Sequence, residues 1–496
     1  MKLLKLSAVA ALTCALSITA NASENKPKRE LKNNMMVKTN ITPKAVDNIK
    51  DAFGEGIFYG RLRANAFKWD WKNETSKTKD NKAFGLGGSM IYKTAPLMGL
   101  SAMAGLYYTS SPFSGLREDD SDVGFLKAGK DTISRRQVAD GGAWSYAVLA
   151  QANIEYKYSK TKFKAGRQIF ESFLTKSNDT KMIPNTFMGY TVETKELSNT
   201  RIRGAYFTAQ KLRDHTTFHD VLTFKNGAGE SWANNDDSAV HKGLSYANFV
   251  AAGKDTKHEL IVADIHNTSI KNLKIDVTYG AVPDVISSLT GEVNYKIALP
   301  GGYSLTPGVR YMKQFDDGGG KIGGATLKGG LAGLTGAHLG YKDSDSLDSY
   351  VWMARLVLKK GPLKAKIGYS AVADKADIVA PWRGFPTGGY TRAMAQYNWY
   401  ANTKTFNIEA NYDFDKAGLV PGFSAMARYA IQNFDEAKQA AGVQADSKIL
   451  HMDFRENFGN GLYAKIRVGL VSADSRVGSI DKDSYNEYRF ELNYLF

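Results

Sequence analysis

The stretch WSYAVLAQANIEYKY, residues 144–158, decides the fold class. Every second residue is apolar or aromatic along its length, and a period of two predicts a β-strand. The apolar face carries aromatic rings at both ends and small aliphatic side chains between them. This order is typical of a strand in lipid, because rings suit the headgroup zones and aliphatic groups suit the hydrocarbon. We therefore expect these side chains to face lipid: Trp144, Tyr146, Val148, Ala150, Ala152, Ile154, Tyr156 and Tyr158.

The same period recurs along the chain and predicts 18 strands. Two further runs, 244–252 and 391–400, resemble strands, but each lies inside a long connection, so we interpret both as loop structure. The strands are expected near residues 55–69, 82–93, 98–109, 143–158, 161–169, 187–195, 199–210, 257–266, 271–279, 287–299, 303–316, 348–359, 362–373, 403–414, 422–434, 446–456, 461–473 and 483–496.

The connections between these strands alternate in length. Even-numbered strands are followed by short turns, such as Ser159-Lys160 and Lys360-Gly361, whereas most odd-numbered strands are followed by long polar segments such as 110–142 and 211–256. Short periplasmic turns on one rim and long extracellular loops on the other are typical of an outer-membrane barrel. A β-sandwich or β-helix gives no reason for the difference. We expect an all-β fold, with one transmembrane antiparallel β-barrel over residues 55–496.

The composition excludes several other protein classes. The 496 residues include 47 Gly, 26 Tyr and 24 Phe but only 12 Pro. No apolar run reaches the ~18 residues that a transmembrane helix needs, and neither a heptad repeat nor a Gly-X-Y repeat occurs. Cys14 is the only cysteine, so a disulfide framework is impossible.

The first 22 residues have the pattern of a secretory signal peptide. Two lysines precede an apolar run from Leu6 to Ile18, and Ala20-Asn21-Ala22 is a small-residue cleavage site. Residues 23–54 would then form a periplasmic N-terminal segment, with either one short helix or a disordered tail. The formal net charge of +15 is compatible with nucleic-acid binding in principle. Export argues against nucleic acid as a partner, and the basic residues do not form one block.

The last predicted strand ends at the final residue, Phe496. Tyr488, Phe490, Leu492 and Tyr494 alternate with it on the outward face. An aromatic terminus on an amphipathic strand resembles the assembly signal that the barrel-assembly machinery reads in bacterial outer-membrane proteins. We therefore predict that the protein is an integral component of the bacterial outer membrane.

The opposite strand face is basic. Charges that faced lipid near the middle of the membrane would cost about 2–4 kcal/mol each, so they are expected to point into the lumen. They either brace the barrel or form a polar channel that attracts anions, and we favour the channel because so many strands enclose more space than side chains fill. The predicted pore-lining basic track consists of Arg61, Arg63, Arg201, Arg203, Arg310, Arg355, Arg428, Lys465, Arg467 and Arg489.

Several stretches resemble the OprD-type outer-membrane porins, and more closely their relatives among the major porins of epsilonproteobacteria. They are GRQ at 166–168, MIPNTFMG at 182–189, YFTA at 206–209 and LVPGFSAMARY at 419–429. Each stretch is weak alone, but their order and spacing together are specific. The likeness runs from about residue 50 to the end of the chain.

The resemblance implies passive diffusion of small solutes, which often carry carboxylates. It also implies that a third extracellular loop, here residues 168–186, folds inward as a constriction. The family has a basic ladder on its closing strands, which carries over by position to Lys465, Arg467 and Arg489, with Arg428 as a neighbour. Lys465 stands where Arg is common, and an ammonium group cannot reproduce a bidentate carboxylate contact.

Other motifs carry little function. His215 and His219 have the spacing of helical metal ligands, but they lie in a long loop without a third ligand, so we interpret them as surface histidines. Asp343, Asp345 and Asp348 lack the Gly of a calcium loop and are expected to be solvated. The Gly-rich run 318–340 lacks a phosphate-binding ending. We expect no metal and no cofactor.

The sequence therefore predicts a porin for passive diffusion of small hydrophilic solutes, with anion or carboxylate preference. The alternative is a mainly structural or adhesive surface protein whose long loops bind receptors. An enzyme is not expected, because the seven scattered histidines offer no convergent catalytic set. The expected surroundings are outer-membrane lipid and lipopolysaccharide, and the protein is either a monomer or a trimer.

Overall fold

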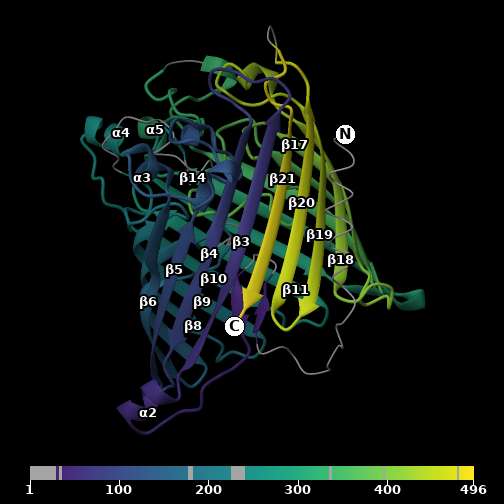
Figure 1. Ribbon diagram of the computed structural model, residues 1–496. Helices are drawn as coiled ribbons and strands as arrows, with labels where there is room; N and C mark the ends of the chain where they lie inside the picture. The colour runs from purple at the N-terminus through teal and green to yellow at the C-terminus, as the bar shows by residue number, and fades with distance from the viewer. Residues whose placement is uncertain are drawn as a thin grey trace.

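A computed structural model describes residues 29–32, 36–176, 182–224, 241–334, 338–394, 397–476 and 480–496. The expected signal peptide, residues 1–22, lies outside these ranges. The described residues form one closed antiparallel barrel (Figure 1). Each strand pairs with its neighbours in sequence, and β21 (Tyr485–Leu495) closes the barrel by pairing with β3 (Ile57–Trp71).

In the described part of the chain the barrel has 18 strands, because β12 and β13 both pair with β14 and form one interrupted strand. The predicted fold class is confirmed. The other strands are β4 (Asn81–Lys93), β5 (Leu100–Ser110), β6 (Ser145–Tyr158), β7 (Thr161–Gln168), β8 (Thr186–Thr194), β9 (Thr200–Lys211), β10 (Leu260–Asn267), β11 (Leu273–Val282), β12 (Ile286–Tyr295), β13 (Ile297–Leu299), β14 (Tyr303–Asp316), β15 (Ser349–Lys360), β16 (Leu363–Val372), β17 (Lys404–Asp413), β18 (Phe423–Asn433), β19 (Ser447–Gly459) and β20 (Leu462–Ala473).

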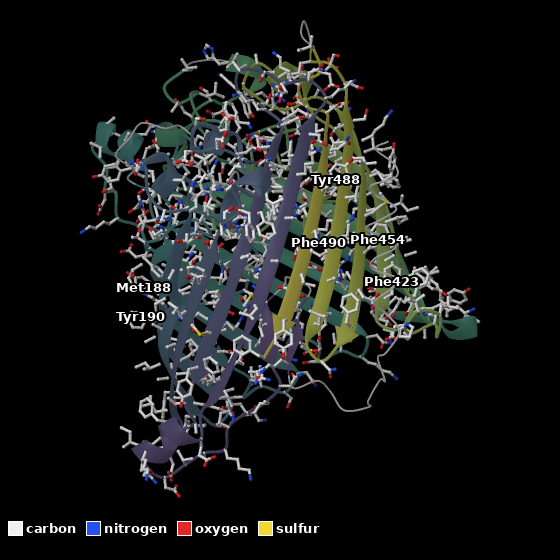
Figure 2. The ribbon with its side chains drawn as sticks, viewed as in Figure 1. Met188, Tyr190, Phe423, Phe454, Tyr488 and Phe490 are labelled. Carbon is white, nitrogen blue, oxygen red and sulfur yellow. The ribbon has the colours of Figure 1, made fainter. Side chains whose placement is uncertain are left out.

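Exposed and buried side chains alternate along the strands. In β21, Phe490 and Tyr494 are exposed on the outer surface, while Arg489 and Glu491 are buried on the inner one. Figure 2 shows labelled outward side chains on strands at both sides of the barrel, among them Tyr190 and Phe490. An apolar exterior and a polar interior are what a membrane-spanning barrel requires.

The predicted lipid face of β6 is right for one half of the strand and wrong for the other. A bulge at Ala150 shifts the pairing of β6 with β5 by one residue. From Ile154 to Tyr158 the aromatic and aliphatic side chains face outward as expected. One extra residue moves the side chains beyond the bulge to the opposite face. The side chains that pack inside the barrel instead of in lipid are Trp144, Tyr146, Val148 and Ala150.

The long connections contain short helices, several of which Figure 1 places at one rim. The run 244–252 holds the helix α4 and the described part of 391–400 holds no strand, so neither adds a strand to the barrel, as predicted. The helical elements of the connections are η1 (Ser114–Leu116), η2 (Asp120–Phe125), η3 (Lys130–Thr132), α3 (Arg135–Ala139), α4 (Tyr246–Ala251), η4 (Pro300–Gly302), α5 (Gly320–Gly323), η5 (His338–Gly340) and η6 (Glu436–Lys438).

The segment before β3 forms a small strand pair, β1 (Arg29–Leu31) with β2 (Val37–Thr39), and the helix α2 (Ile49–Gly54). The side chain of Asn48 caps α2 by accepting a hydrogen bond from the Asp51 N–H at 2.9 Å. Val37 packs against a cluster of inward-facing barrel residues. The Lys32 ammonium lies 3.4 Å from the Glu171 carboxylate, so the strand pair contacts the inside of the barrel.

The largest apolar cluster lies inside the barrel, under the long loops. It joins inward-facing strand residues such as Phe207 and Met353 to loop residues such as Phe170, Trp382 and Trp399. Burial of these rings stabilises loops that fold into the lumen. Among the residues that the structure describes, no helix is both long and apolar enough to cross a membrane.

Candidate functional site

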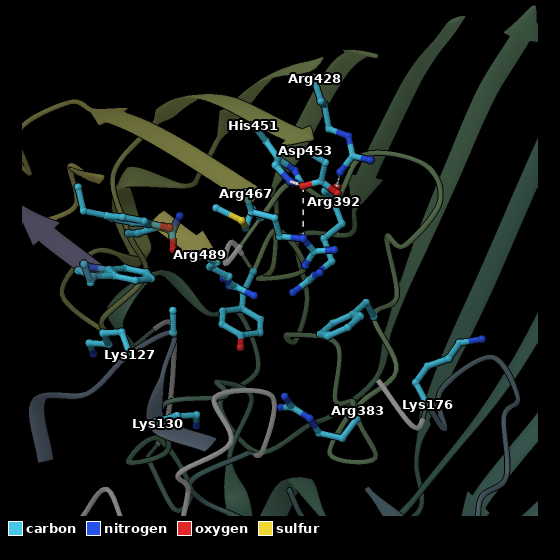
Figure 3. Close-up of a pocket in the computed structure, with 18 of the residues that line it drawn as sticks. Lys127, Lys130, Lys176, Arg383, Arg392, Arg428, His451, Asp453, Arg467 and Arg489 are labelled. Atoms are coloured by element: carbon cyan, nitrogen blue, oxygen red, sulfur yellow. Dashed lines mark hydrogen bonds and ion pairs between the residues drawn. The ribbon is translucent and has the colours of Figure 1, made fainter. Parts of the chain in front are cut away.

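The inner wall and the inward-folded loops enclose a cavity of about 1660 Å³. Among the described residues that line it, 21 are Lys or Arg and only five are Asp or Glu. Figure 3 shows basic side chains that converge on this cavity from several sides. The excess of positive charge identifies the lumen as the candidate functional site.

A row of charged residues crosses the wall formed by β16 to β19. The strand register places Lys366 opposite Glu409, Glu409 opposite Arg428, and Arg428 opposite His451. The Glu409 carboxylate lies 2.8 Å from the Lys366 ammonium and 2.5 Å from the Arg428 guanidinium. The one carboxylate in this row is therefore held between two cations.

Asp453 on β19 is the centre of the next group. Its carboxylate lies 3.3 Å from both the Lys465 ammonium and the Arg467 guanidinium, and 2.8 Å from the His451 imidazole. Arg467 lies directly opposite Arg489 in the β20–β21 pair. Arg489 donates to the carboxylate of Glu487. The closing strands thus carry positive charge that is partly neutralised within the wall.

Glu292 organises the adjoining part of the wall, which is formed by β12, β14 and β15. Its carboxylate lies 2.5 Å from the Arg310 guanidinium and 2.9 Å from that of Arg355. Arg310 also donates to the carbonyl oxygens of Pro386 and Gly388 at 3.2 and 2.9 Å. These arginines therefore fix the loop 373–403 against the wall as well as bracing the strands.

The structure places the ten predicted track residues in two groups. Arg355, Arg428, Arg467 and Arg489 line the cavity. The other six point inward but do not line it, and most of them are ion-paired. They are Arg61, which donates to Asn493; Arg63, beside Glu491; Arg201, opposite His266; Arg203, paired with Asp264; Arg310, paired with Glu292; and Lys465, paired with Asp453.

The described part of the loop 168–186 packs inside the barrel. Phe170 and Leu174 belong to the internal apolar cluster. At the base of this loop, Gly166 lies opposite Gly189, with φ of +115° and +151°. Such backbone angles favour glycine, and a Cβ at Gly166 or Gly189 would also lie 2.3 or 2.1 Å from a carbonyl oxygen of the neighbouring strand. The GRQ motif that carries Gly166 is thus where the chain leaves the wall.

A second loop, 373–403, folds inward and joins the first. The N–H of Lys176 donates to the carbonyl of Trp382 at 3.1 Å, and the N–H of Gly384 donates to that of Leu174 at 2.7 Å. A Cβ at Gly384 would lie 2.2 Å from the Leu174 oxygen, so the contact requires glycine. Sequence reasoning missed this loop, although its content of Trp, Tyr and Phe is as unsuited to solvent as that of 168–186.

This second loop adds Arg392 to the cavity wall. The guanidinium lies 3.5 Å from the centre of the Phe385 ring, and no carboxylate lies within ion-pair distance among the residues that the structure describes. Burial lowers the pKa of Arg392 to about 10, so the group stays charged at neutral pH. Arg392 can therefore offer a full positive charge to a solute.

The histidine prediction needs a correction. His215 is buried, not on the surface, and its Nδ1 lies 2.8 Å from Nε2 of His219. Apolar packing of both rings against Phe224 accounts for the burial. Across the described ranges, no group of three or more His, Cys, Asp or Glu residues could hold a metal ion.

A family model described as "outer membrane porin, OprD family" matches residues 124–496. No curated protein sequence matches the chain. Solved structures with the same fold include the following three. OccK9 (OpdG) of Pseudomonas aeruginosa has a TM-score of 0.65 at 16% identity, covering 90% of this chain and 99% of that one. OpdK of P. aeruginosa with vanillate has a TM-score of 0.64 at 16% identity, with the same coverage. OccAB3 of Acinetobacter baumannii has a TM-score of 0.66 at 15% identity, covering 89% and 99%.

Proposed function

This chain belongs to the OprD family of outer-membrane porins, and from that premise we propose that its passive channel prefers small anions, carboxylates in particular. Family and fold are those of a bacterial outer-membrane channel for small solutes rather than of an enzyme. The single observation that supports the preference is the ratio of 21 basic to five acidic residues around the cavity.

The physical basis of the preference is a fixed surplus of positive charge in a narrow, walled passage. Charges inside low-dielectric walls act more strongly on an ion than the same charges in bulk water. An anion entering the cavity exchanges hydration for contacts with guanidinium and ammonium groups, while a cation is repelled. Because many cations share the passage, an anion can move from one to the next without being trapped at a single deep site.

The arginines of the closing strands favour carboxylates among anions. A guanidinium presents two parallel N–H donors that match the two oxygens of a carboxylate. Arg467 and Arg489, directly opposite each other on β20 and β21, place two such groups side by side. The solved OpdK structure contains vanillate, a carboxylate, which supports the same class of solute here.

The loops 168–186 and 373–403 together form the proposed constriction. They contact one another through the backbone of Leu174, Lys176, Trp382 and Gly384. Deletion of 168–186 removes one side of the constriction, so single-channel conductance should rise while the barrel still assembles. Unchanged conductance in a folded deletion variant would place the narrowest point elsewhere.

Ion selectivity tests the proposal. The purified protein is inserted into planar bilayers, and the reversal potential is measured in a KCl gradient. We expect the sign that indicates chloride preference, weakening at high salt as the Debye length shrinks to about 3 Å at 1 M. Replacement of Arg467 and Arg489 by Gln should reduce the preference. Changing the outward-facing Leu462 and Ile466 to Ala is the matched control. A cation-selective wild-type channel would contradict the proposal.

A further inference from the structure

Four lysines on extracellular loops gather at the mouth of the cavity. Lys127 and Lys130 come from the loop between β5 and β6, Lys242 from the loop between β9 and β10, and Lys328 from the loop between β14 and β15. All four line the same cavity. Figure 3 labels Lys127 and Lys130 on one side of it, across from the group around Asp453. We refer to these four residues as the vestibule lysines.

The loop backbone fixes the vestibule lysines in two pairs. Lys127 and Lys130 lie in one tight turn, where the Lys130 N–H donates to the Lys127 carbonyl at 3.4 Å. The N–H of Lys242 donates to the carbonyl of Leu327 at 2.9 Å, so Lys242 lies beside Lys328. The N–H of Leu327 in turn donates to the buried carboxylate of Asp377 at 2.8 Å. The arrangement therefore does not depend on a bound solute.

These lysines have fewer counter-charges than the strand wall provides: Tyr400 and the nearby charge of Asp377 raise the pKa of Lys328. In the described part of the chain, none of the four ammonium groups forms an ion pair with a carboxylate. Lys127 and Lys328 instead lie over aromatic rings, 5.8 Å from the centre of Trp71 and 5.3 Å from that of Tyr400. Burial, and then the charges of Lys130, Lys328, Arg135 and Lys242, lower the pKa of Lys127 to about 8. Burial, and then the charges of Lys328 and Lys130, also lower the pKa of Lys242, so the ammonium groups are close enough to repel one another.

We propose that the vestibule lysines form a capture site for phosphate-bearing solutes: inorganic phosphate, pyrophosphate and phosphate monoesters. The inference rests on the proposed anion channel and names a second solute class at its entrance. A doubly charged anion relieves repulsion among several cations better than a single carboxylate does. Ammonium groups are compact charges with rotatable donors and suit tetrahedral oxyanions, whereas the planar arginine fork suits carboxylates. The lumen would then hold two successive sites of different chemistry.

Pyrophosphate block of the chloride current tests this inference. The protein is placed in planar bilayers of phosphatidylcholine that contain no lipopolysaccharide, and pyrophosphate is added to the side of the long loops. We expect concentration-dependent block. Replacement of Lys127 and Lys130 by Gln, and separately of Lys242 and Lys328 by Gln, should each weaken the apparent affinity for pyrophosphate by about tenfold or more, because each variant loses two cationic donors to the anion.

The matched control replaces Lys254 and Lys257 by Gln. Both are exposed on the same loop as Lys242, but they do not line the cavity, so block should not change. Heat-modifiable gel mobility confirms that each variant is folded. Equal pyrophosphate affinity in the folded vestibule variants and the wild type would overturn the inference.

Two further measurements separate this inference from its premise and from lipid phosphate. The KCl reversal potential reports anion preference independently, so a channel without that preference that still binds pyrophosphate would refute the proposed function and leave the capture site standing. Lipopolysaccharide is then added to the bilayer. Unchanged pyrophosphate block supports a site inside the lumen, whereas loss of block would assign the lysines to lipid phosphates.

Discussion

The strand wall and the inward-folded loops carry positive charge in different ways. On the wall, carboxylates lie between cations, as Glu409 does between Lys366 and Arg428. On the loops, Arg392 and the vestibule lysines have no carboxylate at ion-pair distance among the described residues. A paired cation has some of its donors occupied and its field partly cancelled, whereas all the donors of an unpaired cation are available to a solute. The comparison indicates that the wall maintains the shape of the pore and the loops supply most of its surplus charge.

The largest expected effect is on stability, through the wall. Replacement of Asp453 by Ala leaves Lys465, Arg467 and His451 in an enclosed site without their shared counter-charge. Removal of one member of a buried ion group costs about 3–5 kcal/mol. We expect that loss in the free energy of unfolding, measured by urea titration in lipid vesicles.

The control for this stability test is Asp415 changed to Ala, because Asp415 lies exposed in a short turn. Its free energy of unfolding should stay within ~0.5 kcal/mol of the wild type. If Asp453 and Asp415 variants were equally stable, the wall charges would not be bracing charges.

The next effect concerns the contact between the two inward loops. In a Gly384→Val variant, the new side chain would collide with the carbonyl oxygen of Leu174. The collision should separate loop 373–403 from loop 168–186. We expect higher and noisier single-channel conductance. The control is Gly115→Val, because a Cβ at Gly115 would meet no atom within 4 Å. Identical current traces for the two variants would show that the loop contact does not set the pore width.

A smaller effect is expected from pH, because Lys127 has a lowered pKa of about 8. A lysine with a lowered pKa is charged below that value and loses its charge as the pH rises through it. Anion preference should therefore fall between about pH 7 and pH 9, while arginines remain charged. Reversal potentials measured across this range should show the fall in the wild type. In the Lys127→Gln variant the pH dependence should be weaker, and an unchanged dependence would assign the titration to another group.

The smallest effect is predicted for a charge-neutral change in the wall. Replacing Lys366 and Glu409 together by Gln removes one positive and one negative charge, so the net field in the pore hardly changes. The KCl reversal potential should match that of the wild type within experimental error. A shift toward cation preference as large as that caused by removing a vestibule lysine would break the distinction between wall and loops.

The barrel itself could be predicted from the sequence, because period-two alternation and connection length are local signals. The bulge at Ala150 could not, since both faces of residues 144–152 are largely apolar and a one-residue shift leaves no mark in such a pattern. For the same reason, the inward position of Tyr146 was missed. The alternation of inward and outward residues along each strand was enough to place Arg428 and Arg467 correctly on the inner face.

Which charges pair with each other depends on the register between neighbouring strands, and the alternation pattern within one strand does not reveal that register. Asp453 meets Lys465 and Arg467 only because of the register between β19 and β20. The inward fold of loop 373–403 depends on its contact with loop 168–186, far away in sequence. The vestibule lysines come from three separate loops, so no local motif could identify them.

We propose that loop cations, more than paired wall charges, set the preference for anions. The most direct test compares KCl reversal potentials at low salt for two variants of the channel. One replaces Lys127, Lys130, Lys242, Lys328 and Arg392 by Gln, and the other is the neutral wall variant with Gln at 366 and 409. The loop variant should lose most of its chloride preference, whereas the wall variant should keep it. Full chloride preference in the folded loop variant would show that the loop cations do not set the selectivity.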